Sequence, residues 1–235
     1  MVESGARARS AGRPKEAILS HDRILDEAFA LSDEKGADFT LAALARRLGV
    51  RPSALHHYFQ GRDALIAGMR GKLTLRVGDH GFDSRPWHEA IVPWARAYRD
   101  TLGAHPALIA ALATLPVAGE PESIADYERI AAAFHRDGYP EHRIVPAIIA
   151  LESFVVGSSL DALAPEDNLR PHEGGAGSGA GSSAGSGSGS APALARAERA
   201  ARASAHDAGV DAATATFEFG LAALVAGLRA AGEPR

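Results

Sequence analysis

The side chains that could do chemistry in this sequence point to binding rather than to catalysis. His88-Glu89 and Glu141-His142 are isolated pairs at the starts of expected helices, where solvated first-turn residues are common. The chain has no cysteine, which excludes disulfides, thiolate metal sites and a cysteine nucleophile. It also lacks a nucleophile-elbow serine motif, a phosphate-binding glycine loop and an HExxH zinc motif. We therefore expect no enzymatic activity, no cofactor and no bound metal.

The segment TLAALARRLGVRPSALHHYFQGRDALIAG, which begins at Thr40, has the spacing of two short helices joined by a tight turn. Thr40 is a suitable N-cap for a helix over 41–48. Gly49 can take the left-handed conformation that a tight turn requires. Pro52 suits the first turn of a second helix that extends to about Tyr58. Such a pair of helices is a helix-turn-helix.

The outward face of this second helix carries short or polar side chains: Arg51, Ser53, Ala54, His57 and Tyr58. Such groups suit base edges and phosphates in the major groove of DNA. An ordinary helical hairpin with a solvated polar face is the alternative. The adjacent pair His56-His57 is not expected to chelate a metal, because neighbouring residues on a helix point about 100° apart.

The elements that must position this segment are all helices. The 235-residue chain is 46% hydrophobic but only 6% aromatic, and strand-forming residues rarely cluster. Apolar positions instead recur with helical spacing, so we predict an all-α fold. The expected helices cover about 20–35, 41–48, 52–58, 62–77, 86–103, 106–115, 121–136, 140–163, 193–206 and 211–230.

Composition divides the chain into three parts: a flexible basic arm over 1–18, a helix-turn-helix domain over 19–66, and a larger body over 67–235. Residues 1–80 have a net charge of +3 and the remainder −7, a balance that suits a DNA-binding module on an acidic body. A Gly/Ser tract at about 165–191 cannot bury apolar surface and is expected to be a disordered loop. We see no signal peptide and no apolar run near the ~20 residues of a membrane span. The expected location is the cytoplasm.

Residues 20–68 closely resemble the tetracycline-repressor (TetR/AcrR) family of transcriptional regulators. The matching positions are Ile24-Leu25-Asp26-Glu27-Ala28, Gly36, Phe39-Thr40, Leu44-Ala45, Leu48-Gly49-Val50, Leu55, Tyr58-Phe59 and Arg62-Asp63-Ala64-Leu65. The resemblance implies a homodimeric repressor that binds a palindromic operator and is released by a small molecule. An activator, or a DNA-binding regulator without a ligand, is the alternative.

The same resemblance implies roles for individual residues in DNA binding. Thr40 would cap its helix and touch a phosphate. Arg51, Ser53, Ala54 and His57 would contact bases and the nearby backbone. The remaining three positions depart from the family pattern, with His56 in place of a phosphate-bonding tyrosine, Tyr58 in place of a histidine and Arg62 in place of a lysine. Tyr58 and Arg62 can still bond phosphate.

The body contains the stretches HPALIAALA, FHRDGYPEHRIVPAIIALESFVVGSSLDAL and FEFGLAALVAGLRA, on which it resembles the branch of the tetracycline repressor itself. Its two most apolar helices, over 141–163 and 211–230, are candidates for a dimer interface. Both are too apolar on all sides for helices that face solvent. The predicted interface residues are Ile148, Leu151, Val155, Phe217, Leu221, Leu224, Val225 and Leu228. Burial within one subunit is the alternative.

A ligand pocket is expected between these helices and the helices over 86–136. The candidate apolar lining is Trp94, Tyr98, Leu112, Tyr127, Phe134 and Phe154. His105 and Asp161 fall where the tetracycline-binding members of the family have a metal-coordinating histidine and glutamate. The resemblance therefore adds these two residues to the pocket. Their part in metal-assisted ligand binding, and the identity of the effector, stay open.

Overall fold

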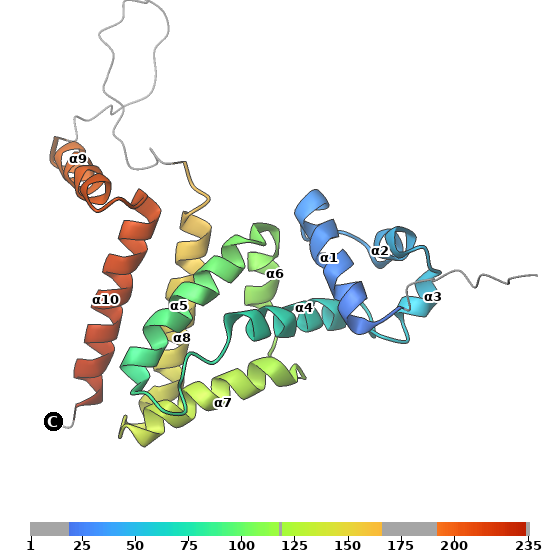
Figure 1. Ribbon diagram of the computed structural model, residues 1–235, viewed down its shortest axis with the longest axis horizontal. Helices are drawn as coiled ribbons and strands as arrows, with labels where there is room; N and C mark the ends of the chain where they lie inside the picture. Colours follow the sequence, from blue (N-terminus) through green and yellow to red (C-terminus); the bar gives the residue numbers. More distant parts are fainter. Residues whose placement is uncertain (1–18, 118, 166–191, 234–235) are drawn as a thin grey trace, which may run out of the picture.

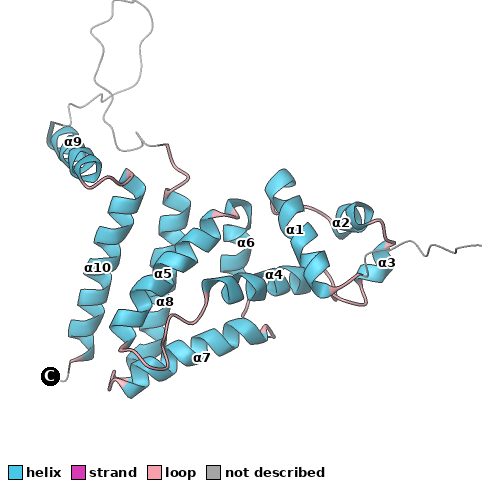
Figure 2. Ribbon diagram, in the orientation of Figure 1, coloured by secondary structure: helices cyan, strands magenta, loops and turns pink. Residues whose placement is uncertain are grey.

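The computed structural model describes residues 19–117, 119–165 and 192–233, and within these ranges every regular element is a helix (Figures 1 and 2). The elements are α1 His21–Lys35, α2 Leu41–Leu48, α3 Pro52–Leu55, α4 Arg62–Val77, α5 Trp87–Gly103, η1 Pro106–Leu108, α6 Ile109–Thr114, α7 Pro121–Arg136, α8 Glu141–Asp161, α9 Pro192–Asp207 and α10 Ala212–Gly232. The all-α prediction is confirmed. The expected basic arm and the Gly/Ser tract lie outside the described residues.

Helix boundaries follow the local signals of the sequence, with two differences. Thr40 caps α2, its hydroxyl oxygen accepting from the Ala43 N–H at 3.1 Å, and Gly49 is left-handed at φ 71°. The α-helical part of α3 ends at Leu55, three residues earlier than predicted. The Leu55 carbonyl accepts from both the Tyr58 and Phe59 N–H groups, so residues 56–58 form tighter turns. The predicted helix over 106–115 begins as the 3₁₀ turn η1 and continues as α6.

Helices α1, α2 and α3 form a small unit at one end of the molecule (Figure 1). Its core consists of fully or almost fully buried side chains: Ile24, Ala28, Phe29, Leu44, Ala45 and Leu55. The apolar spacing within each short helix produces this core, because side chains three and four positions apart lie on one face.

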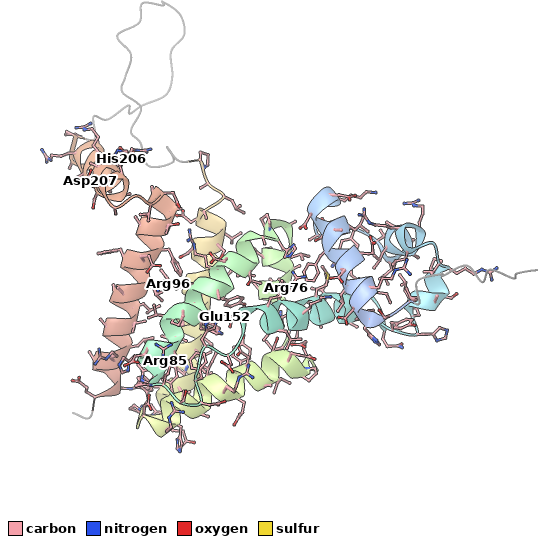
Figure 3. The ribbon with its side chains drawn as sticks, viewed as in Figure 1. Arg76, Arg85, Arg96, Glu152, His206 and Asp207 are labelled. Atoms are coloured by element: carbon pink, nitrogen blue, oxygen red, sulfur yellow. The ribbon has the colours of Figure 1, made fainter. Side chains whose placement is uncertain are left out.

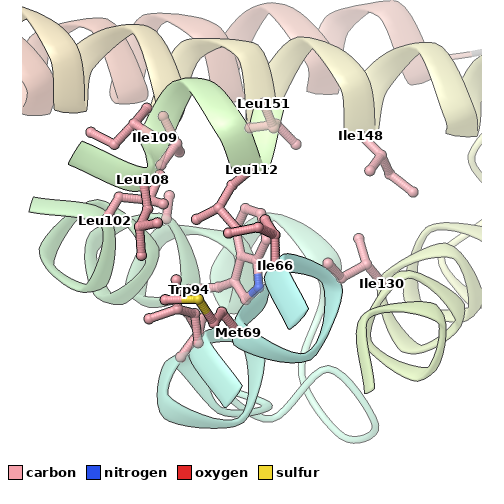
Figure 4. Close-up of a cluster of buried hydrophobic side chains, with 14 of the residues drawn as sticks. Ile66, Met69, Trp94, Leu102, Leu108, Ile109, Leu112, Ile130, Ile148 and Leu151 are labelled. Atoms are coloured by element: carbon pink, nitrogen blue, oxygen red, sulfur yellow. The ribbon is translucent and has the colours of Figure 1, made fainter. Parts of the chain in front are cut away.

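Helix α4 runs from this unit into the body and belongs to both cores. It packs against α1 on one side and against α5, α6 and α7 on the other. Ile66 and Met69, both fully buried, lie beside Trp94 and Leu112 of the body (Figure 4). A displacement of body helices that contact α4 would therefore act directly on the helix that carries the helix-turn-helix.

The body is a layered bundle in which α8 packs against α5, α7 and α10. Helices α8 and α10 are each 21 residues long and, by length and composition alone, are apolar enough to cross a membrane. Neither was expected as a span from the sequence, because charged residues interrupt the apolar runs of both helices. Each packs one face on neighbouring helices and leaves apolar side chains on the other, including Ile149 and Phe219.

Candidate functional site

The exposed surface of the helix-turn-helix carries most of the predicted DNA-contacting side chains. Arg51, Ser53, His56 and His57 are exposed and Ala54 is half-buried, whereas Leu55 is 1% exposed and anchors α3 to the core. The folding of α3 thus turns its polar residues outward together. The Thr40 hydroxyl is also exposed; its oxygen caps α2, so its proton remains available to an acceptor such as a phosphate.

Tyr58 and Arg62 both bond within the protein, which corrects the role expected for Tyr58. The Tyr58 hydroxyl donates to the Leu19 carbonyl at 2.8 Å, and it has only one proton to donate. The Arg62 guanidinium donates to the Ala37 carbonyl and lies 3.8 Å from the Asp38 carboxylate. Arg62 uses one nitrogen in this bonding, and its side chain, 39% exposed, keeps other N–H donors for a phosphate. In this geometry both side chains hold the helix-turn-helix together, and Tyr58 has no proton left for a phosphate.

The body contains a cavity of about 260 Å³ between α4, α5, α6, α7 and α8. Tyr98, Leu112 and Tyr127 line it, as predicted for the ligand pocket. A smaller cavity of about 30 Å³ adjoins it, shares Arg70, Tyr98 and Tyr127 in its walls, and is also lined by Trp94. The larger volume is close to the lower end of the ~300–1,000 Å³ that small-molecule sites occupy.

Four side chains predicted for the pocket lie elsewhere. Phe134 stacks on Trp87 in the core at 4.2 Å between ring centroids, and Phe154 stacks on Phe217 between α8 and α10. Asp161 is exposed at the last residue of α8. His105 lies at the junction with α1, so His105 and Asp161 do not form the metal site that the tetracycline-binding resemblance suggested.

Glu152 is the main polar group of the cavity, and it was not among the residues predicted for the pocket. The Tyr127 hydroxyl donates to its Oε1 at 2.6 Å and the Tyr98 hydroxyl donates to the same atom at 3.3 Å. Figure 3 places Glu152 in the middle of the body. Burial and the negative charge of Glu152 raise the pKa of both phenols, so both remain protonated donors at neutral pH. The sequence did carry a signal that could have identified Glu152, because it is the only charged residue of α8 between Arg143 and Asp161.

Arg70, also missed, joins the cavity to α4. Its guanidinium donates to the carbonyls of Leu112, Leu115 (2.7 Å) and Pro116 (3.1 Å), at the C-terminal end of α6. These carbonyls lack helical partners, and a cation is favoured there by the helix dipole. Arg70 therefore fixes α6 to α4 at the wall of the cavity.

A second connection joins the body to α1. His105 Nδ1 lies 3.1 Å from an Asp33 oxygen, its Nε2 lies 3.1 Å from Arg76 Nη1, and its ring lies 4.5 Å from the Phe29 ring. With the proton on Nδ1, a neutral imidazole satisfies both contacts, donating to Asp33 and accepting from Arg76. Figure 3 shows Arg76 near this junction.

The residues predicted for the dimer interface are mostly part of the chain's own core. Six of them are at most 8% exposed in the single chain: Ile148, Leu151, Val155, Phe217, Leu221 and Val225. Leu224 and Leu228 are half-buried against the same core. The six buried side chains have little surface left for a partner, whereas Leu224 and Leu228 keep part of theirs. The same two helices expose a different apolar set: Val145, Ile149, Leu160 and Phe219.

Comparison with known proteins agrees with both halves of this description. Residues 24–69 match the model of bacterial regulatory proteins of the tetR family, and residues 82–231 match that of the tetracyclin repressor-like C-terminal domain. Among curated relatives, the HTH-type transcriptional repressor DrrR1 of Streptomyces coeruleorubidus is 24% identical over 166 residues, which cover 68% of this chain and 59% of that protein. The match thus spans about three fifths of the relative's length.

Solved structures show the same fold over nearly the whole chain. A possible TetR family transcriptional regulator from Streptomyces coelicolor A3(2) is 26% identical with a TM-score of 0.69, covering 90% of this chain and 99% of that one. The S. coelicolor TetR family protein ActR in complex with actinorhodin is 22% identical with a TM-score of 0.68, covering 92% of this chain and all of that one. Because the two family models together match most of the sequence, the chain belongs to the TetR family of bacterial regulators.

Proposed function

We propose that this protein is a transcriptional repressor that binds a palindromic operator as a homodimer and leaves it when a small molecule enters the 260 Å³ cavity. One observation carries the proposal: α4 begins at the helix-turn-helix and passes beside the cavity, where Arg70 binds the end of α6. The same helix thus contacts both candidate sites. Membership of the TetR family supports the proposal, as do a relative named as a repressor and the relative solved with actinorhodin.

On the DNA side, the exposed residues of α3 and its N-terminus would read the major groove. Arg51, Ser53, Ala54 and His57 would contact base edges and nearby backbone, and Thr40 would donate to a phosphate. His56 is exposed beside them and stands as a further phosphate donor. Tyr58 would act indirectly, by holding α3 in position, while Arg62 would both hold α4 and offer its remaining N–H groups to a phosphate.

On the ligand side, an effector that enlarges the cavity would push against α6. Because Arg70 binds the Leu112 carbonyl of α6 and the carbonyls of the two residues after Thr114, this displacement would move α4 and with it the helix-turn-helix. In a two-fold dimer, a rotation of each α4 changes the separation of the two recognition helices, and a palindromic site tolerates only one separation. Effector binding would then weaken operator binding.

The proposed dimer interface is the outward face of α8 and α10 rather than the buried face. Ile149 is 55% exposed and Phe219 is 77% exposed, which is unusual for large apolar side chains of a free surface. A symmetric four-helix contact would cover both faces and match the two-fold symmetry of the operator. Burial of these faces against a second copy, in the cytoplasm, also accounts for their apolar character without a membrane.

The test uses the intact chain and fluorescently labelled DNA from upstream of its own gene, with random DNA of the same length as a reference. Anisotropy should show tight binding to the first and weak, salt-sensitive binding to the second. Arg51→Ala should lose about 1–3 kcal/mol per half-site on the operator. Arg196→Ala, on the exposed surface of α9, is the matched control and should leave binding unchanged.

The two alternatives give different results in the same experiment combined with in vitro transcription. Repression requires that the bound protein lowers transcription from the promoter, whereas an activator raises it. A ligand-independent regulator would bind the operator with the same affinity in the presence of every compound that occupies the cavity. Equal binding to operator and random DNA would reject sequence-specific recognition altogether.

A further inference from the structure

Glu152 lines the larger cavity and has one carboxylate oxygen without a hydrogen-bond partner among the described residues. Both tyrosine hydroxyls, of Tyr98 and Tyr127, donate to Oε1. Among the described residues, Oε2 accepts no hydrogen bond and Glu152 forms no ion pair, while the side chain lines the cavity. A carboxylate that is partly withdrawn from water gains most from a donor that also carries a positive charge.

The cationic side chain nearest to this carboxylate in the cavity wall has other partners. Arg70 lines the same cavity, but its guanidinium donates to three carbonyls at the end of α6. In the adjoining small cavity, Asp126 accepts from Trp94 Nε1 and from Arg129, which pairs with it at 3.0 Å. The larger cavity is therefore lined by a carboxylate that, among the described residues, forms no ion pair, and by an arginine that is bonded to backbone carbonyls.

The remaining walls are mainly apolar. They include Leu102, Ile109, Leu112, Leu115 and Val156, which come from α5, α6, the residue after α6, and α8. Burial of apolar ligand surface against such walls contributes about 25 cal/mol per Å². The arrangement is thus a cavity with both apolar and polar walls, in which Glu152 is the one carboxylate among the described lining residues and two phenols are bonded to it.

We infer that the effector is an apolar monocationic amine whose ammonium group donates to Glu152 Oε2 while its hydrocarbon part lies against the leucine and isoleucine walls. This inference rests on the proposed function for the role of the ligand, and on Glu152 for its chemical class. The two phenols hold Oε1, which leaves Oε2 as the oxygen that can accept from the ligand. Their rings also line the cavity, and aromatic faces attract ammonium ions.

The inference is tested by calorimetric titration of the full chain with three probes of matched shape. These are the 2-naphthylmethylammonium ion, 2-naphthylmethanol and 2-naphthoate, which are cationic, neutral and anionic. The cation should bind roughly tenfold or more tightly than the alcohol, and the carboxylate should bind most weakly. Glu152→Gln preserves the side-chain shape and an acceptor for the tyrosines, so the fold should be retained, as thermal unfolding will show.

In Glu152→Gln the cation should lose about 10- to 100-fold in affinity, whereas the alcohol should change by less than about threefold. Glu128→Gln, on the exposed side of α7, removes the same charge away from the cavity and should leave all three affinities unchanged. No binding of the cation up to millimolar concentration, equal binding of cation and alcohol, or equal loss in the two variants would overturn the inference.

Measurement of operator binding by fluorescence anisotropy, in the presence of the same three probes, separates this inference from the proposed function. If the cation binds through Glu152 but leaves operator affinity unchanged, the effector role fails and the ligand class stands. If neutral or anionic compounds release the operator and the cation does not, the ligand class is wrong and the effector role stands. Release of the operator by the cation, lost in Glu152→Gln and kept in Glu128→Gln, supports both.

Discussion

Replacement of Gly71 by alanine should disturb the contact that joins α4 to α7. Gly71 is buried in α4, and a Cβ at this position would lie 2.1 Å from Glu120 Oε1 and 2.7 Å from its Cδ. Glu120 is 3% exposed and caps α7, accepting from Ser123 N at 2.7 Å and from Glu122 N at 3.3 Å. The added methyl group must therefore displace a buried carboxylate from its two backbone donors.

The expected magnitude combines terms of opposite sign. Alanine in place of glycine within a helix favours folding by up to ~1 kcal/mol. Loss of the N-cap costs ~0.5–2 kcal/mol, and a buried donor left without a partner costs a further ~1–3 kcal/mol. The net effect of Gly71→Ala should be a loss of about 1–2 kcal/mol, since the carboxylate can retain part of its bonding after it moves.

The assay is urea unfolding at one fixed protein concentration, because the proposed dimerisation would make stability depend on concentration. Gly103→Ala is the control: nothing lies within 4 Å of the position that a Cβ would take there, so it should be neutral or slightly stabilising. A double-mutant cycle with Glu120→Ala isolates the contact, because Gly71→Ala should become neutral or stabilising once the carboxylate is gone. Stabilisation by Gly71→Ala in the unaltered chain, equal to that in the double variant, would refute the reasoning.

Three further predictions concern DNA recognition and assembly. His57→Ala should lose about 1–3 kcal/mol per half-site on the operator and leave random-DNA affinity nearly unchanged; an equal loss on both DNAs by anisotropy would make His57 a phosphate contact. Tyr58→Phe should cost about 1 kcal/mol of stability through the lost Leu19 bond and leave the log-log salt slope of operator binding unchanged. A slope flattened by ~1.8, the value for two phosphate contacts per dimer, would instead restore the role first expected for Tyr58. Phe219→Glu should give a folded monomer in sedimentation, whereas Leu221→Glu, at a position 1% exposed, should unfold the chain; a folded dimer in the first case would place the interface elsewhere.

The sequence alone determined the local features of this protein: where its helices begin and end and which residues share a helix face. The caps at Thr40 and Gly49 and the apolar spacing of each helix act within a few residues, so they set the helix boundaries wherever the chain folds. The helix-turn-helix was therefore predictable to within a residue at most of its ends, as was the exposure of Arg51, Ser53 and His57. The shorter α3 depended on the hydrogen bonds of residues 55–59, which composition does not encode.

Contacts between distant segments were decided only by the tertiary structure. Tyr58 reaches Leu19 and thereby uses its only proton, and Arg62 reaches Ala37 with one of its nitrogens. Glu152 Oε1 accepts hydrogen bonds from tyrosines on two other helices, α5 and α7. Spacing within one helix carries no information about such partners, since they depend on how the helices cross.

The sequence alone also could not tell which residues of the two apolar helices are buried in the chain's own core, and six of the eight predicted for the dimer interface are. Helices α8 and α10 are apolar on nearly every side, and periodicity then gives no basis for choosing which face meets the chain's own core. Leu221 and Phe219, two residues apart, are 1% and 77% exposed. The hydrophobic effect favours burial of either face equally. Only the packing of α8 and α10 against each other and against α5 decides which face lies in the core and which remains for a partner.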